Sequence, residues 1–217
     1  MKKLILTLLV AACASTVSAN PAIDPREPPV IVEEATASAM TALNERREEF
    51  AADPGALREM INRDMLPLID TEYSARLILG RAGRDATKEQ LDAFAGAMSD
   101  HLLARYADGL LRFNAEEQID ILPLKGHTSE KLTRVRTRFM LENGSQVPVD
   151  FAFRKTDLGS KAFDVTIEGI SYVANYRKQY AREFRAKGID GVIAELEAKA
   201  AEAPAEPEAA TASAGGQ

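Results

Sequence analysis

The chain has 217 residues and a net charge of −6, with 27 basic and 33 acidic side chains, one cysteine and no tryptophan. This acidic balance argues against a dedicated nucleic-acid-binding protein, which normally has a basic surface. The apolar content of 46% is sufficient for a hydrophobic core, and no apolar run after residue 19 is long enough to span a membrane.

Residues 1–19 have the three parts of a bacterial export signal. A lysine pair is followed by a short apolar stretch, and residues 17–19 (VSA) offer small side chains to signal peptidase. We therefore predict a periplasmic protein that is soluble after cleavage near Ala19. Such cleavage removes Cys13 and leaves no thiol for a disulfide.

Cys13 also supports a competing hypothesis. Residues 10–13 (VAAC) resemble a lipobox, in which the cysteine becomes the lipidated first residue of a lipoprotein. We favour the soluble product because the site after Ala19 suits signal peptidase. The intact mass of the exported protein distinguishes the two products.

Helices are predicted after the signal. Residues 20–29 contain several prolines and are expected to form an extended arm. A helix is expected over residues 30–51, and a second helix over residues 54–65 has a proline in its first turn. Pro67 interrupts this pattern, and a further helix is predicted over residues 70–79.

The clearest helix begins at a capping box formed by Thr87 and Gln90, in which each side chain can satisfy a free backbone amide of the first turn. The apolar side chains that follow have the spacing of a core-facing stripe. They are Leu91, Phe94, Ala95, Met98, Leu102, Tyr106 and Leu110.

Four strands in an antiparallel meander are predicted next. The first covers residues 119–124, and the second and third alternate over residues 135–141 and 147–153. An Asn-Gly pair between the second and third is a strong hairpin signal. The fourth covers residues 163–167, and the sheet is expected to be apolar on one face and charged on the other.

An aromatic stripe marks the helix after the last strand. Ser171 is the expected N-cap of this helix, and Gly188 is expected to end it. A last helix then reaches about residue 197, and residues 198–217, rich in Ala and Glu, are expected to be disordered. The stripe recurs every four residues at Tyr172, Tyr176, Tyr180 and Phe184.

These elements predict a single α+β domain over residues 30–197, in which N-terminal helices accompany a meander sheet curved around helices. Periodicity does not distinguish a solid core from a cavity between sheet and helices, because both need the same inward-facing apolar side chains.

Groups that could perform catalysis are sparse. His127 is expected in an exposed turn, and His101 on the flank of an apolar helix face. Asp164 and Glu168 could act as acid and base near a strand end, but a charged face and a turn account for them, and Ser171 is accounted for as a cap. No ligand spacing indicates a metal site. We therefore predict no enzymatic activity and no cofactor.

Two groups of motifs carry a family resemblance. The first comprises residues 164–171 (DVTIEGIS), 175–177 (NYR) and 188–191 (GIDG). The second comprises residues 76–80 (RLILG) and 86–90 (ATKEQ). Together they resemble the MlaC family, the periplasmic phospholipid-binding components of the maintenance-of-lipid-asymmetry, or toluene-tolerance, ABC transport system.

The resemblance covers most of the chain after the signal, and the order of the elements matches as well. Phe94 and the Tyr106-Ala pair also resemble the family's central helices. Gly83 and Ser160 stand where the family commonly has tryptophan. Both positions lie at loop edges, so these departures bear on the shape of the pocket rather than on the fold.

The resemblance implies a phospholipid carrier with an apolar pocket between sheet and helices that shields acyl chains. It also implies two transient partners, an inner-membrane ABC transporter complex with an MCE-domain subunit and an outer-membrane lipoprotein/porin complex. The residues that we expect to bind lipid are Met98, Leu102, Tyr106, Val149, Phe151, Val165, Ile167, Ile170, Val173 and Tyr176.

A cluster of basic residues in this acidic protein is a candidate docking surface for acidic head groups or partners. Arg177, Arg182 and Arg185 lie on the aromatic-stripe helix, where basic side chains also favour a helix C-terminus. Further arginines are expected on the outer face of the sheet, at Arg134, Arg136, Arg138 and Arg154.

Two other functions stay open at this point. One is an enzyme with an α+β cone-type fold that uses Asp164, Glu168 or His101 in a pocket. The other is a periplasmic adaptor or chaperone with a solid core. Lipid extracted from the purified protein would separate the carrier from both.

Overall fold

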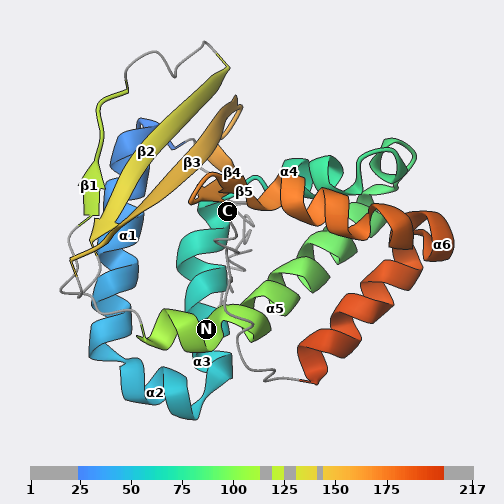
Figure 1. Cartoon of the computed structure of the whole chain (residues 1–217), viewed down its shortest axis with the longest axis horizontal. Coiled ribbons are helices and arrows are strands. Elements are labelled where there is room, and N and C mark those ends of the chain that lie inside the picture. The colour runs from blue at the N-terminus through green and yellow to red at the C-terminus, as the bar shows by residue number, and fades with distance from the viewer. Residues whose placement is uncertain (1–23, 113–118, 125–130, 141–143, 203–217) are drawn as a thin grey trace, which may run out of the picture.

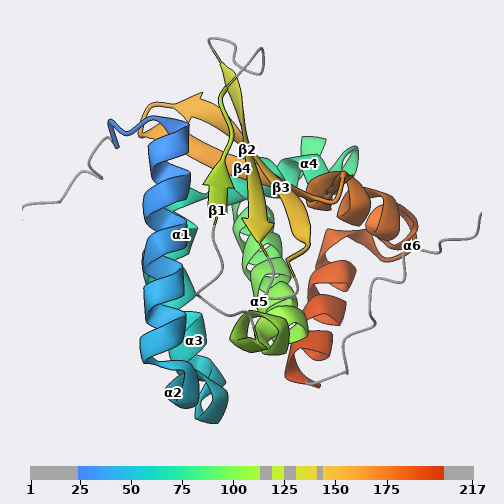
Figure 2. The same cartoon turned by 60° about the vertical axis from the view of Figure 1, so that its left-hand side comes forward.

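The computed structural model describes residues 24–112, 119–124, 131–140 and 144–202. It confirms the α+β class: helices accompany an open antiparallel sheet (Figure 1). Figure 2 shows α1, α5 and the second arm of α6 extending away from the sheet in the same direction. No helix in the described ranges is long and apolar enough to cross a membrane. The predicted export signal, including Cys13, lies outside these ranges.

The N-terminal helices are α1 (Pro28–Glu45), α2 (Arg47–Ala52) and α3 (Pro54–Met60). The single helix predicted over residues 30–51 is wrong in one respect, because the chain leaves helical geometry at Arg46 (φ −121°, ψ 19°). Because of this break, the side chain of Phe50 packs in a cluster with Leu43 and Leu57, where it is fully buried. Burial of a large aromatic ring compensates for the broken helix.

An irregular connection links α3 to the next helix. A π-helical turn, η1 (Ile61–Met65), is followed by a 3-10 turn, η2 (Leu66–Leu68). Pro67 has no backbone N–H to donate, which agrees with the predicted interruption. Helix α4 (Thr71–Leu79) follows, and the side chain of its N-cap Asp70 accepts a hydrogen bond of 3.0 Å from the amide of Tyr73.

Helix α5 (Lys88–Arg112) follows the short turn η3 (Ala82–Arg84) and begins at the predicted capping box. Thr87 Oγ1 accepts from the amide of Gln90, and Gln90 Oε1 accepts from the amide of Thr87, each at 3.2 Å. The capping box is therefore confirmed. Two orphan donors of the first turn are satisfied by side chains.

The sheet has five strands in the order β1-β2-β3-β4-β5, and every neighbouring pair is antiparallel. The predicted meander is confirmed, with one strand more than expected. The predicted first strand is shorter than expected and ends at Ile121. The strands are β1 (Ile119–Ile121), β2 (Leu132–Met140), β3 (Gln146–Thr156), β4 (Gly159–Ile167) and β5 (Ile170–Ser171).

The fifth strand arises from a tight hairpin after β4. Glu168 and Gly169 both have positive φ, of 50° and 83°, as a two-residue hairpin turn requires. This turn brings Ile170 opposite Ile167 and Ser171 opposite Thr166. The extra strand places Ser171 at the start of the next helix.

Helix α6 (Tyr172–Ala201) consists of two arms that meet at Gly188, whose backbone is not helical (φ 70°, ψ −178°). Figure 1 shows the second arm turning back beside α5. The disordered tail predicted from residue 198 begins too early, because the helix continues to Ala201. An i,i+4 hydrogen bond of 2.8 Å between Lys199 and Glu195 stabilises this last turn.

Candidate ligand-binding cavity

The described residues enclose a cavity of about 420 Å³ between the sheet and the helices. Its walls come from α1, the η1–η2 connection, α4, α5, strands β3 and β4, and the first turns of α6. Small-molecule pockets in proteins typically measure about 300–1,000 Å³. The cavity is therefore of ligand-binding size, and the interior is not a solid core.

The sheet contributes a wall of aromatic and aliphatic side chains. Phe151 pairs with Val165 and Phe153 pairs with Ala162, and all four line the cavity. Between these pairs the register shifts, so that Phe163 is an extra residue in β4. A β-bulge of this kind bends the strand.

The bulged residue is fixed by α4. The ring of Phe163 meets the ring of Tyr73 edge-on, with centroids 5.2 Å apart. Its carbonyl oxygen accepts a hydrogen bond of 2.7 Å from Ser74 Oγ. Asp70 N donates to the neighbouring carbonyl of Ala162 at 2.7 Å. These contacts cover the edge of β4, which would otherwise expose unpaired backbone groups.

Two helices provide facing stripes of small and medium side chains. Helix α1 presents Ile31, Val32, Ala35, Thr36 and Ala39. Helix α5 presents Phe94, Ala95, Met98, Ser99 and Leu102 at the same spacing. The spacing of both sets is that of one helix face, so each helix presents a continuous strip to the cavity.

Within the described part of the chain, Asp164 is the one carboxylate that lines the cavity, and no lysine, arginine or histidine lines it. Its Oδ2 accepts a hydrogen bond of 2.6 Å from Ser171 Oγ, and its Oδ1 accepts one of 3.0 Å from the amide of Val173. Ser171 Oγ in turn accepts from the amide of Ala174 at 3.0 Å, which confirms Ser171 as the N-cap of α6. A carboxylate at a helix N-terminus is favourable, so Asp164 acts as part of the cap.

The three residues considered for catalysis have separate environments. Glu168 is exposed in the hairpin turn, whereas Asp164 lines the cavity. His101 is half-buried on α5 and is not among the lining residues; burial, together with Lys199 and Arg105, lowers its pKa. His127 lies outside the described residues. In the described ranges no three His, Cys, Asp or Glu side chains gather as metal ligands.

Six of the ten residues expected to bind lipid lie together in the cavity wall. They come from α5, β3, β4 and α6, which are distant in sequence. These six are Met98, Leu102, Phe151, Val165, Val173 and Tyr176.

The other four are placed differently. Val149 and Ile167 pair with each other on the sheet but do not line the cavity, because the cavity lies at the bulged part of β3 and β4. Ile170 is 57% exposed, because the hairpin turn directs it to the surface. The side chain of Tyr106 lies outside the described part of the chain.

Two parts of the wall were not expected. The η1–η2 connection and the residue that follows it contribute Met65, Leu66, Leu68 and Ile69. Helix α1 contributes its apolar face, whose periodicity was visible in the sequence although its position against the sheet was not. The irregular connection has no periodic signal that could have indicated its role.

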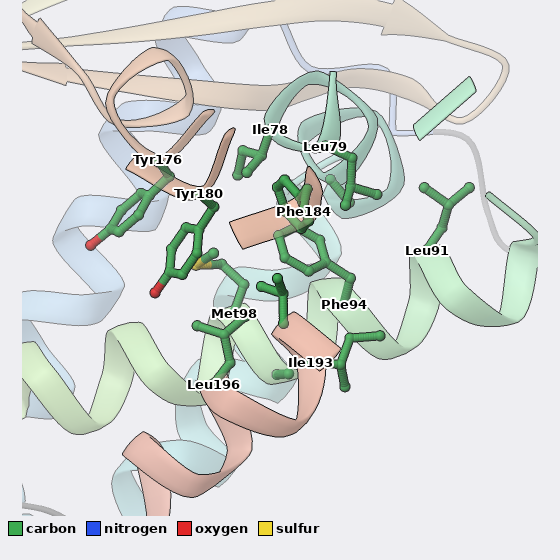
Figure 3. Close-up of a cluster of buried hydrophobic side chains, with 13 residues drawn as sticks. Ile78, Leu79, Leu91, Phe94, Met98, Tyr176, Tyr180, Phe184, Ile193 and Leu196 are labelled. Atoms are coloured by element: carbon green, nitrogen blue, oxygen red, sulfur yellow. The ribbon is translucent and has the colours of Figure 1, made fainter. Parts of the chain in front are cut away.

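Part of the cavity wall belongs to the packed cluster of α4, α5 and α6 (Figure 3). Tyr176 and Tyr180 stack with centroids 6.2 Å apart, and Phe184 meets Phe94 edge-on at 5.6 Å. Figure 3 shows Phe94 and Met98 of α5 on the α6-facing side of their helix. This cluster packs α6 against α4 and α5.

The candidate docking arginines Arg177, Arg182 and Arg185 are all exposed on the first arm of α6. The guanidinium of Arg177 lies over the end of α4, where a Cβ at Gly80 would be 3.1 Å from Arg177 Nε. The expectation for Arg154 needs correction, because its Nε donates to Asp70 Oδ2 at 2.5 Å and its guanidinium stacks on the ring of Tyr73. Arg154 therefore contributes to packing against α4.

The arginines on β2 are only partly exposed for the docking that we considered for the outer face of the sheet. Arg134 is exposed, as expected. Arg136 donates to the carbonyl oxygen of Pro123 at 3.2 Å, and Arg138 donates to that of Thr137 at 3.1 Å. Both are partly buried.

An α+β fold with an apolar internal cavity defines a protein that binds apolar ligands. A profile of the family described as MlaC protein matches residues 33–198. The chain belongs to the MlaC family.

Relatives and a solved structure agree with this assignment. The sequence is 22% identical to the intermembrane phospholipid transport system binding protein MlaC of Haemophilus influenzae, over 90% of this chain and 92% of that protein. It is 25% identical to the toluene tolerance protein ttg2D of Pseudomonas putida, over 88% and 85% of the two chains. The fold matches a phospholipid-binding protein from Ralstonia solanacearum, solved with a phospholipid, with a TM-score of 0.74, 19% identity and coverage of 81% and 98%.

Proposed function

We propose that this chain is a periplasmic phospholipid-binding protein that carries phospholipids between the membranes of the cell envelope. The observation that supports this most directly is the apolar cavity of about 420 Å³ at the junction of sheet and helices. Family membership and the phospholipid named for the Haemophilus and Ralstonia proteins give the ligand class.

A carrier of this kind has a simple energetic basis. Each methylene that leaves water gains about 0.8 kcal/mol, so an acyl chain cannot cross an aqueous compartment without a shield. In the cavity wall such a shield is formed by Phe151, Phe153, Met98 and Tyr176. Release then requires a partner that offers the chain a comparable apolar environment.

The chemistry of the wall supports one orientation of the ligand. Among the described residues no cationic side chain lines the cavity, and both oxygens of Asp164 already accept hydrogen bonds. A buried phosphate would therefore be unpaired, at a cost of several kcal/mol. The acyl chain enters the cavity and the head group stays at its mouth.

The partners of this proposal are an inner-membrane ABC transporter complex with an MCE-domain subunit and an outer-membrane lipoprotein/porin complex. The exposed arginines Arg177, Arg182 and Arg185 form the proposed docking surface. The carrier is the single domain of residues 30–197, after export and cleavage near Ala19.

Extraction of the purified protein with organic solvent, followed by lipid mass spectrometry, tests the function. We expect co-purified phospholipid, or its uptake from phosphatidylglycerol vesicles. The variant Val165→Arg, which introduces a cation into the apolar β4 wall of the cavity, is expected to lower the amount of bound lipid. The matched control is Leu158→Arg, at an exposed position in the β3–β4 turn. No lipid in the wild type after incubation with vesicles would overturn the proposal.

A further inference from the structure

The turn between α4 and α5 presents two arginines on its outer side. Arg81 and Arg84 are exposed. Gly83 between them is buried, and Ala82 and Ala86 pack against the cluster of α4, α5 and α6. The turn is therefore anchored by its small side chains, and the two guanidinium groups project from an ordered backbone.

The turn adjoins the first arm of α6. Helix α6 packs against α4 and η3, and Figure 1 shows its first arm beside α4. Arg177 lies at the junction, because a Cβ at Gly80 would be 3.1 Å from Arg177 Nε and Gly80 directly precedes Arg81. The arginines of the turn and those of α6 therefore belong to one continuous surface.

Three further cations follow the outer face of the first arm. Lys178, Arg182 and Arg185 are separated by four and then three residues, and all three are exposed. This spacing places them on one face of a helix. The opposite face carries the aromatic stripe, which packs against α4 and α5. The cations therefore lie on the side of the arm that points away from the core.

The six cations of this surface have no acidic partner. Within the described residues none of them forms an ion pair. Asp85 and Glu183 are the only acids in residues 80–86 and 172–186, so the surface has a net positive charge in a chain of net charge −6. By contrast, ion pairs are formed by Arg26, Arg46, Arg58, Arg63, Arg76 and Arg154.

The composition of the surface favours a protein partner over a membrane. A helix that lies on a membrane inserts its apolar face, but the apolar face of this arm is packed in the core. The exposed large apolar side chains of the described residues lie on other segments, at Val30, Ile69, Leu132, Leu158 and Ile170. Five of the six cations are arginines, the basic residue that is enriched at protein interfaces, where lysine is depleted.

We propose that Arg81 and Arg84 extend the docking surface of α6, and that the whole surface binds a carboxylate-rich surface of a partner protein. This inference rests on the proposed function, because it specifies the chemistry of the partner at the proposed docking surface. Without an apolar centre, opposite charges accelerate the encounter and little else delays dissociation. Brief binding of this kind suits a carrier that has to leave each partner after a transfer.

Charge reversal in the turn tests the extension. Arg81→Glu with Arg84→Glu leaves α6 and the cavity wall unchanged. We expect its affinity for the soluble domain of the MCE-domain subunit to fall about tenfold at about 0.1 M salt, and the difference to shrink at about 1 M salt, where the Debye length is about 3 Å. The matched control is Arg134→Glu with Lys155→Glu, at exposed positions of the sheet. Equal losses in the two double variants would overturn the inference.

Lys178 reports the chemistry of the partner, because it is the one lysine among the six cations. A carbodiimide joins a carboxylate to a lysine amine as an amide, with loss of water, where the two groups are in contact. We expect mass spectrometry to find Lys178 joined to an aspartate or glutamate of the MCE-domain subunit. Lys178→Arg keeps the charge, so it should bind equally well and lack this cross-link. A bound complex whose cross-links all spare Lys178 would contradict the inference.

Vesicles of phosphatidylethanolamine and phosphatidylglycerol test the alternative partner. Wild-type protein that bound these vesicles through Arg81 and Arg84, with no effect of charge reversal on the MCE-domain subunit, would show that the surface docks on a membrane and would overturn the inference. Failure to bind either probe would overturn it as well. The lipid content of the same preparations tests the proposed function separately, and we expect wild type and variants to contain equal lipid. Absence of lipid from all of them, with docking intact, would overturn the proposed function alone.

Discussion

The side chains of Asp164 and Ser171 are joined by a hydrogen bond of 2.6 Å across the β4–β5 hairpin. Asp164 also accepts from the amide of Val173, and Ser171 accepts from the amide of Ala174. Two residues of the family-like motif DVTIEGIS thus satisfy two free donors at the N-terminus of α6. The motif therefore fixes the angle at which α6 leaves the sheet, and with it the position of Tyr172, Val173 and Tyr176 in the cavity wall.

Loss of this cap is expected to destabilise the protein. Ser171→Ala should lower the free energy of unfolding by about 1 kcal/mol, and Asp164→Ala by about 2–3 kcal/mol because a charged acceptor of two hydrogen bonds is lost. Urea denaturation measures both. Asp157→Ala, in the exposed β3–β4 turn, is the control and should change little. Equal effects for Asp157→Ala and Asp164→Ala would contradict the capping role.

A pair of glycines tests the bend in α6. Gly188 has φ 70° and ψ −178°, a region that is almost exclusive to glycine, so Gly188→Ala should cost about 1–3 kcal/mol. Gly96 lies within α5, and an added Cβ would meet nothing within 4 Å. Gly96→Ala should therefore stabilise the protein by about 0.5–1 kcal/mol. The midpoint temperature of thermal denaturation should fall for Gly188→Ala and rise for Gly96→Ala. A higher midpoint for Gly188→Ala would show that the bend is not needed.

The secondary structure could be predicted because its signals are local. The capping box at Thr87, the cap at Ser171 and the glycine bend at Gly188 each depend on a few adjacent residues, and all three are present. The break at Arg46 was missed because it depends on the burial of Phe50 among residues of other helices.

The cavity could be predicted only in part. Periodicity identifies the inward face of a helix but not what that face meets. Leu91 and Met98 belong to the same stripe of α5 and to the same cluster with α6, yet of the two only Met98 also lines the cavity. Ile170 continues the apolar sequence after β4, but the tight turn exposes it. Arg154 was expected on a charged face, whereas it binds Asp70 across 84 positions in the sequence.

The two arms of α6 are tied by a carboxylate whose pKa is strongly lowered. Glu195 in the second arm pairs with Lys187 in the first arm and with Lys199. Hydrogen bonds from Lys187 and then from Lys199 lower the pKa of Glu195 from 4.5 to about 2. Because the pKa is lower in the folded state, the stabilisation is full above pH 4.5 and is lost as the pH falls toward 2.

Glu195→Gln should therefore reduce the free energy of unfolding at pH 7, and the difference from the wild type should shrink between pH 4.5 and 2. Urea denaturation at a series of pH values measures this difference. Glu197→Gln, exposed on the same arm, is the control. A difference between Glu195→Gln and the wild type that does not vary with pH would show that the ion pairs contribute no pH-dependent stability.

The N-terminal arm is expected to depend on Gly159. The amide of Asp24 donates to the carbonyl oxygen of Leu158 at 3.0 Å, and a Cβ at Gly159 would lie 2.1 Å from the carbonyl oxygen of Asp24. Gly159→Ala must therefore displace the arm, and its φ of 100° adds strain. Proteolysis should then cleave the arm faster than in the wild type. Gly144→Ala, with positive φ but open space around it, separates strain from the clash, and equal cleavage in both variants would contradict the role of the arm contact.

Charge reversal tests the proposed docking surface on α6. Arg182→Glu and Arg185→Glu together change the charge of an exposed face that lies outside the cavity wall. We expect weaker binding to the proposed partner, the MCE-domain subunit, and a smaller dependence of affinity on salt, because fewer opposite charges attract across the interface. Lipid content should stay at the wild-type level. Arg58→Glu with Arg63→Glu makes the same charge change on α3 and η1 and serves as the control. If the two double variants bound the subunit with equal affinity and equal salt dependence, net charge rather than this surface would govern association.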